Sequence, residues 1–254
     1  LLLDLSNIPN HWEYPNEISA VFFCAGITSI KACQENPQMT RKINVENTLK
    51  LIHQFIKNKI HVIYLSTNMV FDGSKPKSII SEKLKPKTNY GKQKADVEKE
   101  LLSLNSRYIS IVRFSKIIDY NLPLFNGWII SLLKKEPVYS FSDLAISPVT
   151  RKFSTDILYK IAEKKITGIL QVSGESDIRY CDFASLIAKK IGADKLLINP
   201  IKASESIDYY HLLPKNTTMN TDLLFEKLNV NPPNIEKTVQ YLLHNFEKNY
   251  KSLI

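Results

Sequence analysis

The sequence predicts an α/β fold that is built on a parallel β-sheet. Between residues 18 and 115, short apolar runs rich in β-branched residues alternate with longer amphipathic stretches, which is the pattern of βαβ units. The 254 residues, of which 44% are hydrophobic and 23% charged, suit one large or two small globular domains. Hydroxyl residues end the second apolar run, at the edge where open α/β sheets bind ligands.

The first half of the chain predicts strands and helices in regular alternation. We expect strands at 20–25, 61–67 and 108–114, and helices from about 37 to 57 and from 90 to about 104. Thr88 or Asn89 can cap the second helix, because both side chains offer an oxygen to free backbone N–H groups. The neighbouring carboxylates Glu98 and Glu100 fall on this helix, where we expect both to be solvated.

Beyond residue 115 the pattern changes to longer helices separated by short strands, among them Gly168–Val172. The stretch Asp182–Gly192 predicts a helix with one apolar face, basic residues in its last turn and a terminating glycine. We therefore expect the second half to form a smaller, mainly helical domain.

Composition and charge exclude several classes of protein. The three cysteines form no CxxC pair and have no histidine at ligand spacing, so we expect no metal site, no disulfide framework and a reducing compartment, the cytoplasm. No apolar stretch approaches the roughly 20 residues that span a bilayer. The net charge of +9 is spread along the chain without a run of five basic residues. This favours a solvated basic surface, with neither nucleic acid nor membrane as a partner.

Four residues predict acid and base chemistry. Ser66 and Thr67 end a predicted strand, and Tyr90 and Lys94 lie four residues apart on the helix that follows, so both point to one face. A neighbouring ammonium stabilises a phenolate, so we expect Lys94 to lower the pKa of Tyr90 toward neutrality. Thr67 could donate a hydrogen bond to the same substrate oxygen, and together these groups would polarise a carbonyl while a cofactor transfers hydride.

These motifs resemble the extended short-chain dehydrogenases/reductases and, within them, the dTDP-4-dehydrorhamnose reductase family. The resemblance covers roughly residues 18 to 245. The segments that carry it are Phe23–Thr28, Ile43–Thr48, Leu65–Gly73, Asn89–Lys94, Val112–Ser115, Ser147–Pro148, Gly168–Gly174 and Asp182–Ala184. Val70-Phe71-Asp72-Gly73 is the piece most typical of this family.

The resemblance implies a Rossmann-like doubly wound parallel sheet whose first βα units are missing, and a smaller, mainly helical substrate domain. Residues 1–120, with part of 140–172, would form the dinucleotide-binding domain, and 121–254 would form most of the substrate-binding cap. The implied activity is NAD(P)H-dependent reduction of a nucleotide-linked 4-keto sugar in the synthesis of surface polysaccharide precursors. NADP or NAD is the implied cofactor, and the resemblance is compatible with a homodimer.

The resemblance also assigns residues to roles. It makes Thr67, Tyr90 and Lys94 the catalytic triad. The positions implied to bind cofactor are Ala25, Gly26, Thr28, Ser66, Tyr90, Lys94, Phe114 and Ser115. The positions implied to bind substrate are Thr28, Thr67, Asn68 and Tyr90.

Two departures from the family pattern qualify the assignment. Asn68-Met69 stands where the family usually has Asp-Tyr, and the seven glycines include no GxxGxxG spacing for a pyrophosphate-binding turn. We expect the sequence to be N-terminally truncated, since it begins with Leu1 rather than Met. Two alternatives stay open: a nucleotide-sugar epimerase or dehydratase of the same superfamily, and a non-catalytic regulatory subunit that binds the cofactor.

Overall fold

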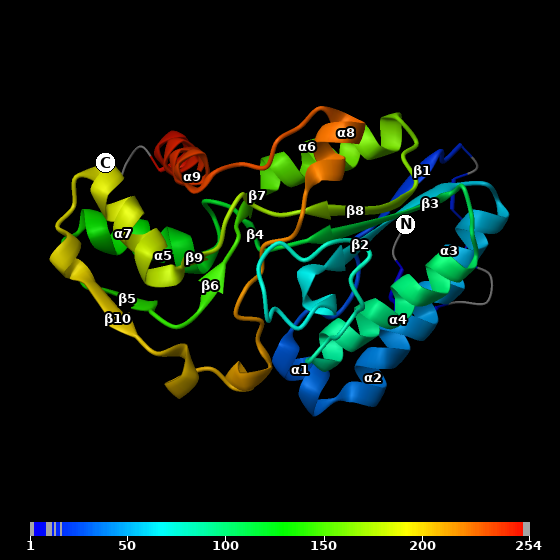
Figure 1. The fold of residues 1–254 in the computed structure, drawn as a ribbon, viewed down its shortest axis with the longest axis horizontal. Coiled ribbons are helices and arrows are strands. Elements are labelled where there is room, and N and C mark those ends of the chain that lie inside the picture. Colours follow the sequence, from blue (N-terminus) through cyan, green and yellow to red (C-terminus); the bar gives the residue numbers. More distant parts are fainter. Residues whose placement is uncertain (1–2, 9–11, 13, 16, 251–254) are drawn as a thin grey trace.

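The computed structural model describes residues 3–8, 12, 14–15 and 17–250, and a four-stranded parallel sheet forms its centre (Figure 1). The strands follow the order β1-β2-β3-β8. Their bounds are Ala20–Phe23 (β1), His61–Thr67 (β2), Ile109–Phe114 (β3) and Gly168–Val172 (β8). Thr67 at the end of β2 lies opposite Phe114, which in turn lies opposite Val172, so the three strands end at one edge. The predicted α/β class with a parallel sheet is confirmed.

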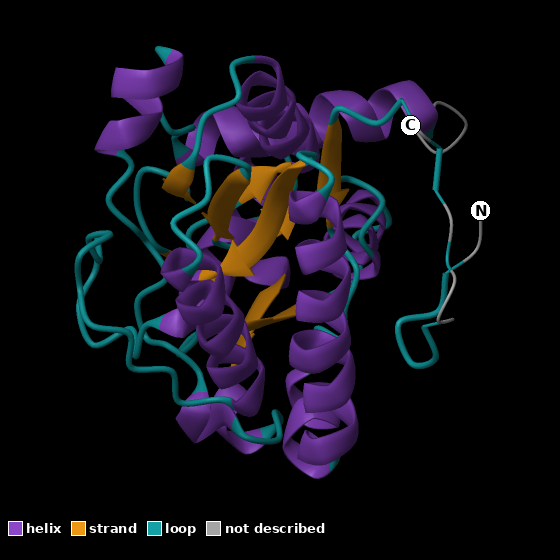
Figure 2. Ribbon diagram, turned by 90° about the vertical axis from the view of Figure 1, so that its right-hand side faces the viewer, coloured by secondary structure: helices purple, strands orange, loops and turns teal. Residues whose placement is uncertain are grey.

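Helices cover both faces of the sheet (Figure 2). One layer contains α1 (Ile30–Glu35), α2 (Pro37–Arg41), the π-helical segment η1 (Lys42–Asn47), α3 (Thr48–Lys57) and α4 (Asn89–Ser103). The other layer contains α6 (Arg151–Glu163) and α8 (Asp222–Leu228). Alternate residues of β2 serve the two layers: Val62 and Tyr64 pack with α3 and α4, whereas Ile63 packs with α6 and α8.

The remaining elements lie beyond the carboxyl end of the sheet, on the left of Figure 1. They comprise the helices α5 (Pro123–Leu133), α7 (Tyr180–Ile191) and α9 (Ile235–Asn249), and the short strands β4 (Ile117–Ile118), β5 (Val138–Phe141), β6 (Ala145–Ile146), β7 (Val149–Thr150), β9 (Ile178–Arg179) and β10 (Ile198–Ile201). The apolar faces of the three helices meet in a separate core around Phe125, Phe183 and Phe246. Helix α7 ends at Gly192, whose φ of 72° permits the left-handed cap.

Short 3-10 turns complete the described chain. They are η2 (Asn68–Val70), η3 (Lys195–Leu197), η4 (Ala203–Glu205) and η5 (Tyr210–Leu212). None of the helices in the described ranges combines the length and apolar character that are needed to cross a bilayer.

Candidate active site

The carboxyl end of β2 holds Thr67 in a fixed position. Thr67 is the last residue of the strand and caps η2, because its Oγ1 accepts a hydrogen bond from the backbone N–H of Met69 at 3.2 Å. Thr67 and Asn68 are both buried. The hydroxyl is therefore presented at the edge where the parallel strands end.

Helix α4 brings Tyr90 to this edge. The helix starts after Thr88, whose Oγ1 accepts a hydrogen bond from the N–H of Gly91 at 3.0 Å. A Cβ at Gly91 would lie 2.3 Å from the carbonyl oxygen of Met69, so this position must be glycine for α4 to approach η2. The close approach places Tyr90 and Thr67 on the wall of one pocket.

The protonation state of Tyr90 differs from the expectation. Burial raises the pKa of Tyr90 to about 12, the nearby Cys33 adds to the rise, and only the hydrogen bond with Thr67 opposes it. The prediction that Lys94 lowers the pKa of Tyr90 is therefore wrong for the protein without ligands. The physical reason is that desolvation of the phenol dominates, because a buried phenolate loses its hydration.

Lys94 lies one turn further along α4 and points to β2 rather than to solvent. Its Nζ donates a hydrogen bond to the carbonyl oxygen of Leu65 at 2.7 Å and lies 4.5 Å from the centre of the Tyr64 ring. Burial lowers the pKa of Lys94 to about 8, although the carboxylate of Glu98 acts in the opposite direction. The ammonium uses one of its three N–H groups on Leu65, so the others can meet a ligand.

Glu98 is not solvated, contrary to the expectation. Its side chain is 0% exposed, and it forms an ion pair with Arg113 of β3, with 2.6 Å between Oε2 and Nη2. Ser66 donates a hydrogen bond to the same carboxylate. Arg113 also donates to the Gln171 side chain at 3.1 Å and lies over the Phe71 ring. The sequence pattern did not reveal this pair, because Arg113 lies on β3 and meets α4 only in the folded structure. Glu100 is exposed, as expected.

The loop after β1 is held by the π-helical segment. The side chain of Asn44 accepts a hydrogen bond from the N–H of Ile27 at 2.7 Å and donates to its carbonyl oxygen at 2.8 Å. Asn44 also donates to the side chain of Gln93 on α4 at 2.8 Å. The loop that contains Gly26 is thus tied to the helix that carries Tyr90, and π-helical turns often occur at such sites.

A pocket of about 340 Å³ opens where these elements meet. It lies between the sheet edge and the segments that precede α6 and α8. The lining residues are Thr28, Ile30, Thr67, Asn68, Met69, Tyr90, Ser115, Lys116, Leu144, Ala145, Ile146, Tyr180, Leu213, Pro214 and Thr217. Hydroxyl and amide groups therefore share the walls with apolar side chains, a combination that suits a hydroxylated ring.

The structure brings five predicted site residues together on this pocket: Thr28, Thr67, Asn68, Tyr90 and Ser115. The other predicted residues lie around it. Lys94 is buried against β2, and Ser66 donates its hydrogen bond to Glu98. Phe114 belongs to the core under α6, and Ala25 and Gly26 lie in the exposed loop after β1.

Several lining residues were not predicted. Lys116 is the second residue after β3, while Tyr180 and Thr217 come from far along the chain. Glu98, which does not line the pocket, could have been recognised as a neighbour of Lys94, since a spacing of four residues places both on one face of α4. The positions of Tyr180 and Thr217 depend on tertiary packing and had no local signal.

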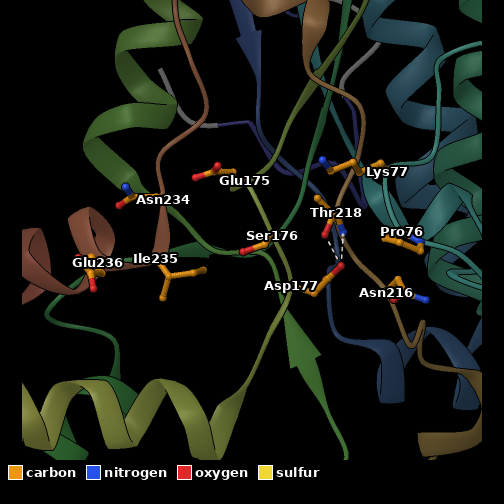
Figure 3. Close-up of a pocket in the computed structure, with 10 residues that line it drawn as sticks. All are labelled: Pro76, Lys77, Glu175, Ser176, Asp177, Asn216, Thr218, Asn234, Ile235 and Glu236. Atoms are coloured by element: carbon orange, nitrogen blue, oxygen red, sulfur yellow. Dashed lines mark hydrogen bonds between the residues drawn. The ribbon is translucent and has the colours of Figure 1, made fainter.

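A second and larger cleft, of about 700 Å³, lies beside the start of α9 (Figure 3). Asp177 accepts hydrogen bonds from Thr218, which lines this cleft, and from Thr217, which lines the first pocket. Asp177 thus fixes the segment that separates the two cavities. None of the predicted site residues lines the larger cleft, so size alone does not identify the site.

Comparison with known proteins gives consistent matches. The family model described as the RmlD substrate binding domain matches residues 7–248. A dTDP-4-dehydrorhamnose reductase of Aggregatibacter actinomycetemcomitans is 25% identical over 234 residues, which cover 87% of this chain and 79% of the relative. A probable low-salt glycan biosynthesis reductase, Agl14, of Haloferax volcanii is 22% identical over 227 residues, covering 87% of this chain and 75% of the relative.

Solved structures share the fold. The crystal structure of dTDP-4-dehydrorhamnose reductase from Bacillus anthracis in complex with NADP superposes with a TM-score of 0.78 at 20% identity. The match covers 89% of this chain and 80% of that one.

Proposed function

We propose a function from the family to which this chain belongs, the RmlD substrate binding domain family. The protein is an NAD(P)H-dependent reductase of a nucleotide-linked 4-keto sugar. The observation that carries the proposal is the meeting of Thr67, Tyr90 and Lys94 at the carboxyl end of β2. The two curated relatives are both named as reductases, one of dTDP-4-dehydrorhamnose and one in glycan synthesis. We infer a role in making surface polysaccharide precursors, in the reducing cytoplasm that three free cysteines favour.

The residues around Lys94 fit the nicotinamide riboside half of the cofactor. The Lys94 ammonium keeps two N–H groups for ribose hydroxyls, and the Leu65 carbonyl fixes its direction. We propose that Ala25, Gly26, Thr28, Ser66, Phe114 and Ser115 lie along the cofactor. The Ser66 hydroxyl also donates a hydrogen bond to Glu98, whose carboxylate acts to raise the pKa of Lys94. The sequence has no glycine-rich pyrophosphate turn, so the fit concerns this half alone.

The proposed chemistry divides between cofactor and protein. When bound, the reduced nicotinamide supplies the hydride that adds to the keto carbon. Tyr90, whose pKa is about 12, is protonated at neutral pH and so donates its proton to the oxygen of the former carbonyl group. Thr67 donates a hydrogen bond to the same oxygen, and Thr28 and Asn68 line the space for the sugar.

We further propose a division of labour along the chain. Residues 1–120 with part of 140–172 would bind the dinucleotide, and 121–254 would form most of the substrate cap. Support comes from packing: among the described residues, the buried side chains around Phe125 and Phe183 come from positions 118–246, whereas those around Leu51 and Tyr64 come from 23–111.

The test is an assay with NADPH and dTDP-4-dehydrorhamnose. We expect net oxidation of NADPH, one equivalent for each sugar reduced. Tyr90→Phe should lower kcat by about 100-fold or more, as loss of a general acid does. Tyr159→Phe, at an exposed tyrosine on α6, is the matched control and should leave kcat unchanged. Sugar conversion without net oxidation would instead favour an epimerase, and a folded chain without any turnover would favour the regulatory role.

A further inference from the structure

Lys116 is a charged residue of the active-site pocket to which no role has yet been given. It follows Ser115 at the end of β3 and lines the same pocket as Thr67 and Tyr90. Among the described lining residues it is the one side chain that is charged at neutral pH, because the others are hydroxyl, amide, phenol or apolar groups. The pocket therefore presents one positive charge and no carboxylate.

The described part of the protein supplies no counter-charge to Lys116. The ion pairs found there do not include it, and the carboxylate of Asp119, which follows in the next segment of the chain, pairs with Arg151, with 2.9 Å between Oδ2 and Nε. Lys116 is exposed at the pocket wall, and partial burial by neighbouring protein atoms lowers its pKa. An exposed ammonium at a pocket wall that has no ion-pair partner among the described residues can meet an anion that the ligand brings.

We propose that Lys116 is a specificity-determining residue that receives an anionic oxygen group of the substrate. The inference rests on the proposed function, since it assigns the charge of a ligand to that site. Two parts of a nucleotide-linked sugar could carry the anion: the diphosphate, or a carboxylate on the sugar. The hydroxyl and amide groups of Thr28, Asn68 and Thr217 surround the same space and suit the sugar ring itself.

The test measures binding by calorimetry on the full chain without cofactor, so it does not depend on turnover. The ligands are thymidine, dTDP, dTDP-glucose and dTDP-glucuronate. The variants are Lys116→Met, Lys116→Arg and, as the matched loss of one positive charge, Lys99→Met on the exposed face of α4. We expect Lys116→Met to weaken anionic ligands by about 10- to 100-fold, Lys116→Arg to keep most of the affinity, and Lys99→Met to change nothing.

The ligand series identifies the group that Lys116 meets. An equal loss for dTDP, dTDP-glucose and dTDP-glucuronate assigns it to the diphosphate, and a loss confined to dTDP-glucuronate assigns it to a sugar carboxylate. Unchanged affinities, an equal loss for neutral thymidine, or no binding of any ligand by the wild type would each overturn the inference. Binding that depends on Lys116 in a chain without reductase turnover would refute the proposed function alone. Turnover whose KM is the same in Lys116→Met would refute this inference alone.

Discussion

The buried pair of Glu98 and Arg113 gives the sharpest prediction about stability. Both side chains are almost fully buried, at 0% and 2% exposure, and Arg113 donates from Nε and Nη2 to the carboxylate at 2.6 to 3.1 Å. Arg113→Met removes these bonds and leaves Ser66 as the remaining hydrogen-bond donor to Glu98 among the described residues. The Gln171 oxygen that accepts from Arg113 also loses this donor. Breaking such a pair typically costs about 3–5 kcal/mol.

Urea unfolding at pH 7 measures this cost. The double variant Glu98→Leu/Arg113→Met should recover most of the loss, because apolar residues of similar volume need no counter-charge. Lys152→Met is the control: its pair with Asp156 is 64% and 52% exposed, and exposed pairs contribute about 0–1 kcal/mol. If Arg113→Met destabilises no more than Lys152→Met, the reasoning from buried charge is refuted.

Three further changes test the scaffold of the site. Gly91→Ala drives a Cβ against the Met69 carbonyl, so we expect about 1–3 kcal/mol lower stability in thermal unfolding and a lower kcat. Asn44→Ala frees the loop at Ile27, and limited proteolysis should cleave there faster than in the wild type. Burial lowers the pKa of His61, so the unfolded chain takes up a proton before the folded one and stability should fall as pH drops below about 6.5. The fall should be smaller in His61→Gln, and equal dependences of stability on pH in the two proteins would contradict this.

Local patterns in the sequence were sufficient for the elements that carry the proposed triad. The apolar run His61–Thr67 coincides with β2 because a central parallel strand is buried on both faces and needs no polar alternation. Helix α4 begins where Thr88 can cap it, and the helical repeat then fixes Tyr90 and Lys94 on one face. These features depend on neighbours within a few residues, so they can be predicted without knowing the tertiary structure.

Charge and burial at the site could not be predicted in the same way. The surroundings of Glu98 are set by Arg113, and those of Tyr90 by Cys33 and the turn after Thr67, all of which are brought in by other elements. A helix pattern shows which face a residue occupies but not what covers that face. The error about the pKa of Tyr90 and the error about Glu98 therefore have one cause: desolvation is a property of the folded structure.

Lys94 predicts two pH dependences of opposite sign. Its pKa is lowered from 10.5 to about 8, so between these values the folded lysine is neutral while the unfolded one still holds its proton. Stability therefore rises with pH across this range, by on the order of 3 kcal/mol. Turnover should fall across the same range, because the ammonium that we propose orients the ribose is lost while Tyr90 keeps its proton.

The difference between wild type and Lys94→Met isolates these effects from the titration of other lysines. Urea unfolding from pH 7.5 to 10.5 should show the wild type gaining stability relative to the variant. The pH profile of kcat/KM for the wild type should decline above about 8. A stability difference that stays constant with pH would show that Lys94 keeps an ordinary pKa in the folded protein. Deprotonation of Lys94 removes the desolvation cost of its buried charge, but it also removes the ammonium that we propose binds the ribose. Stability and turnover should therefore change in opposite directions with pH, and parallel rises in both would contradict the proposed role of Lys94.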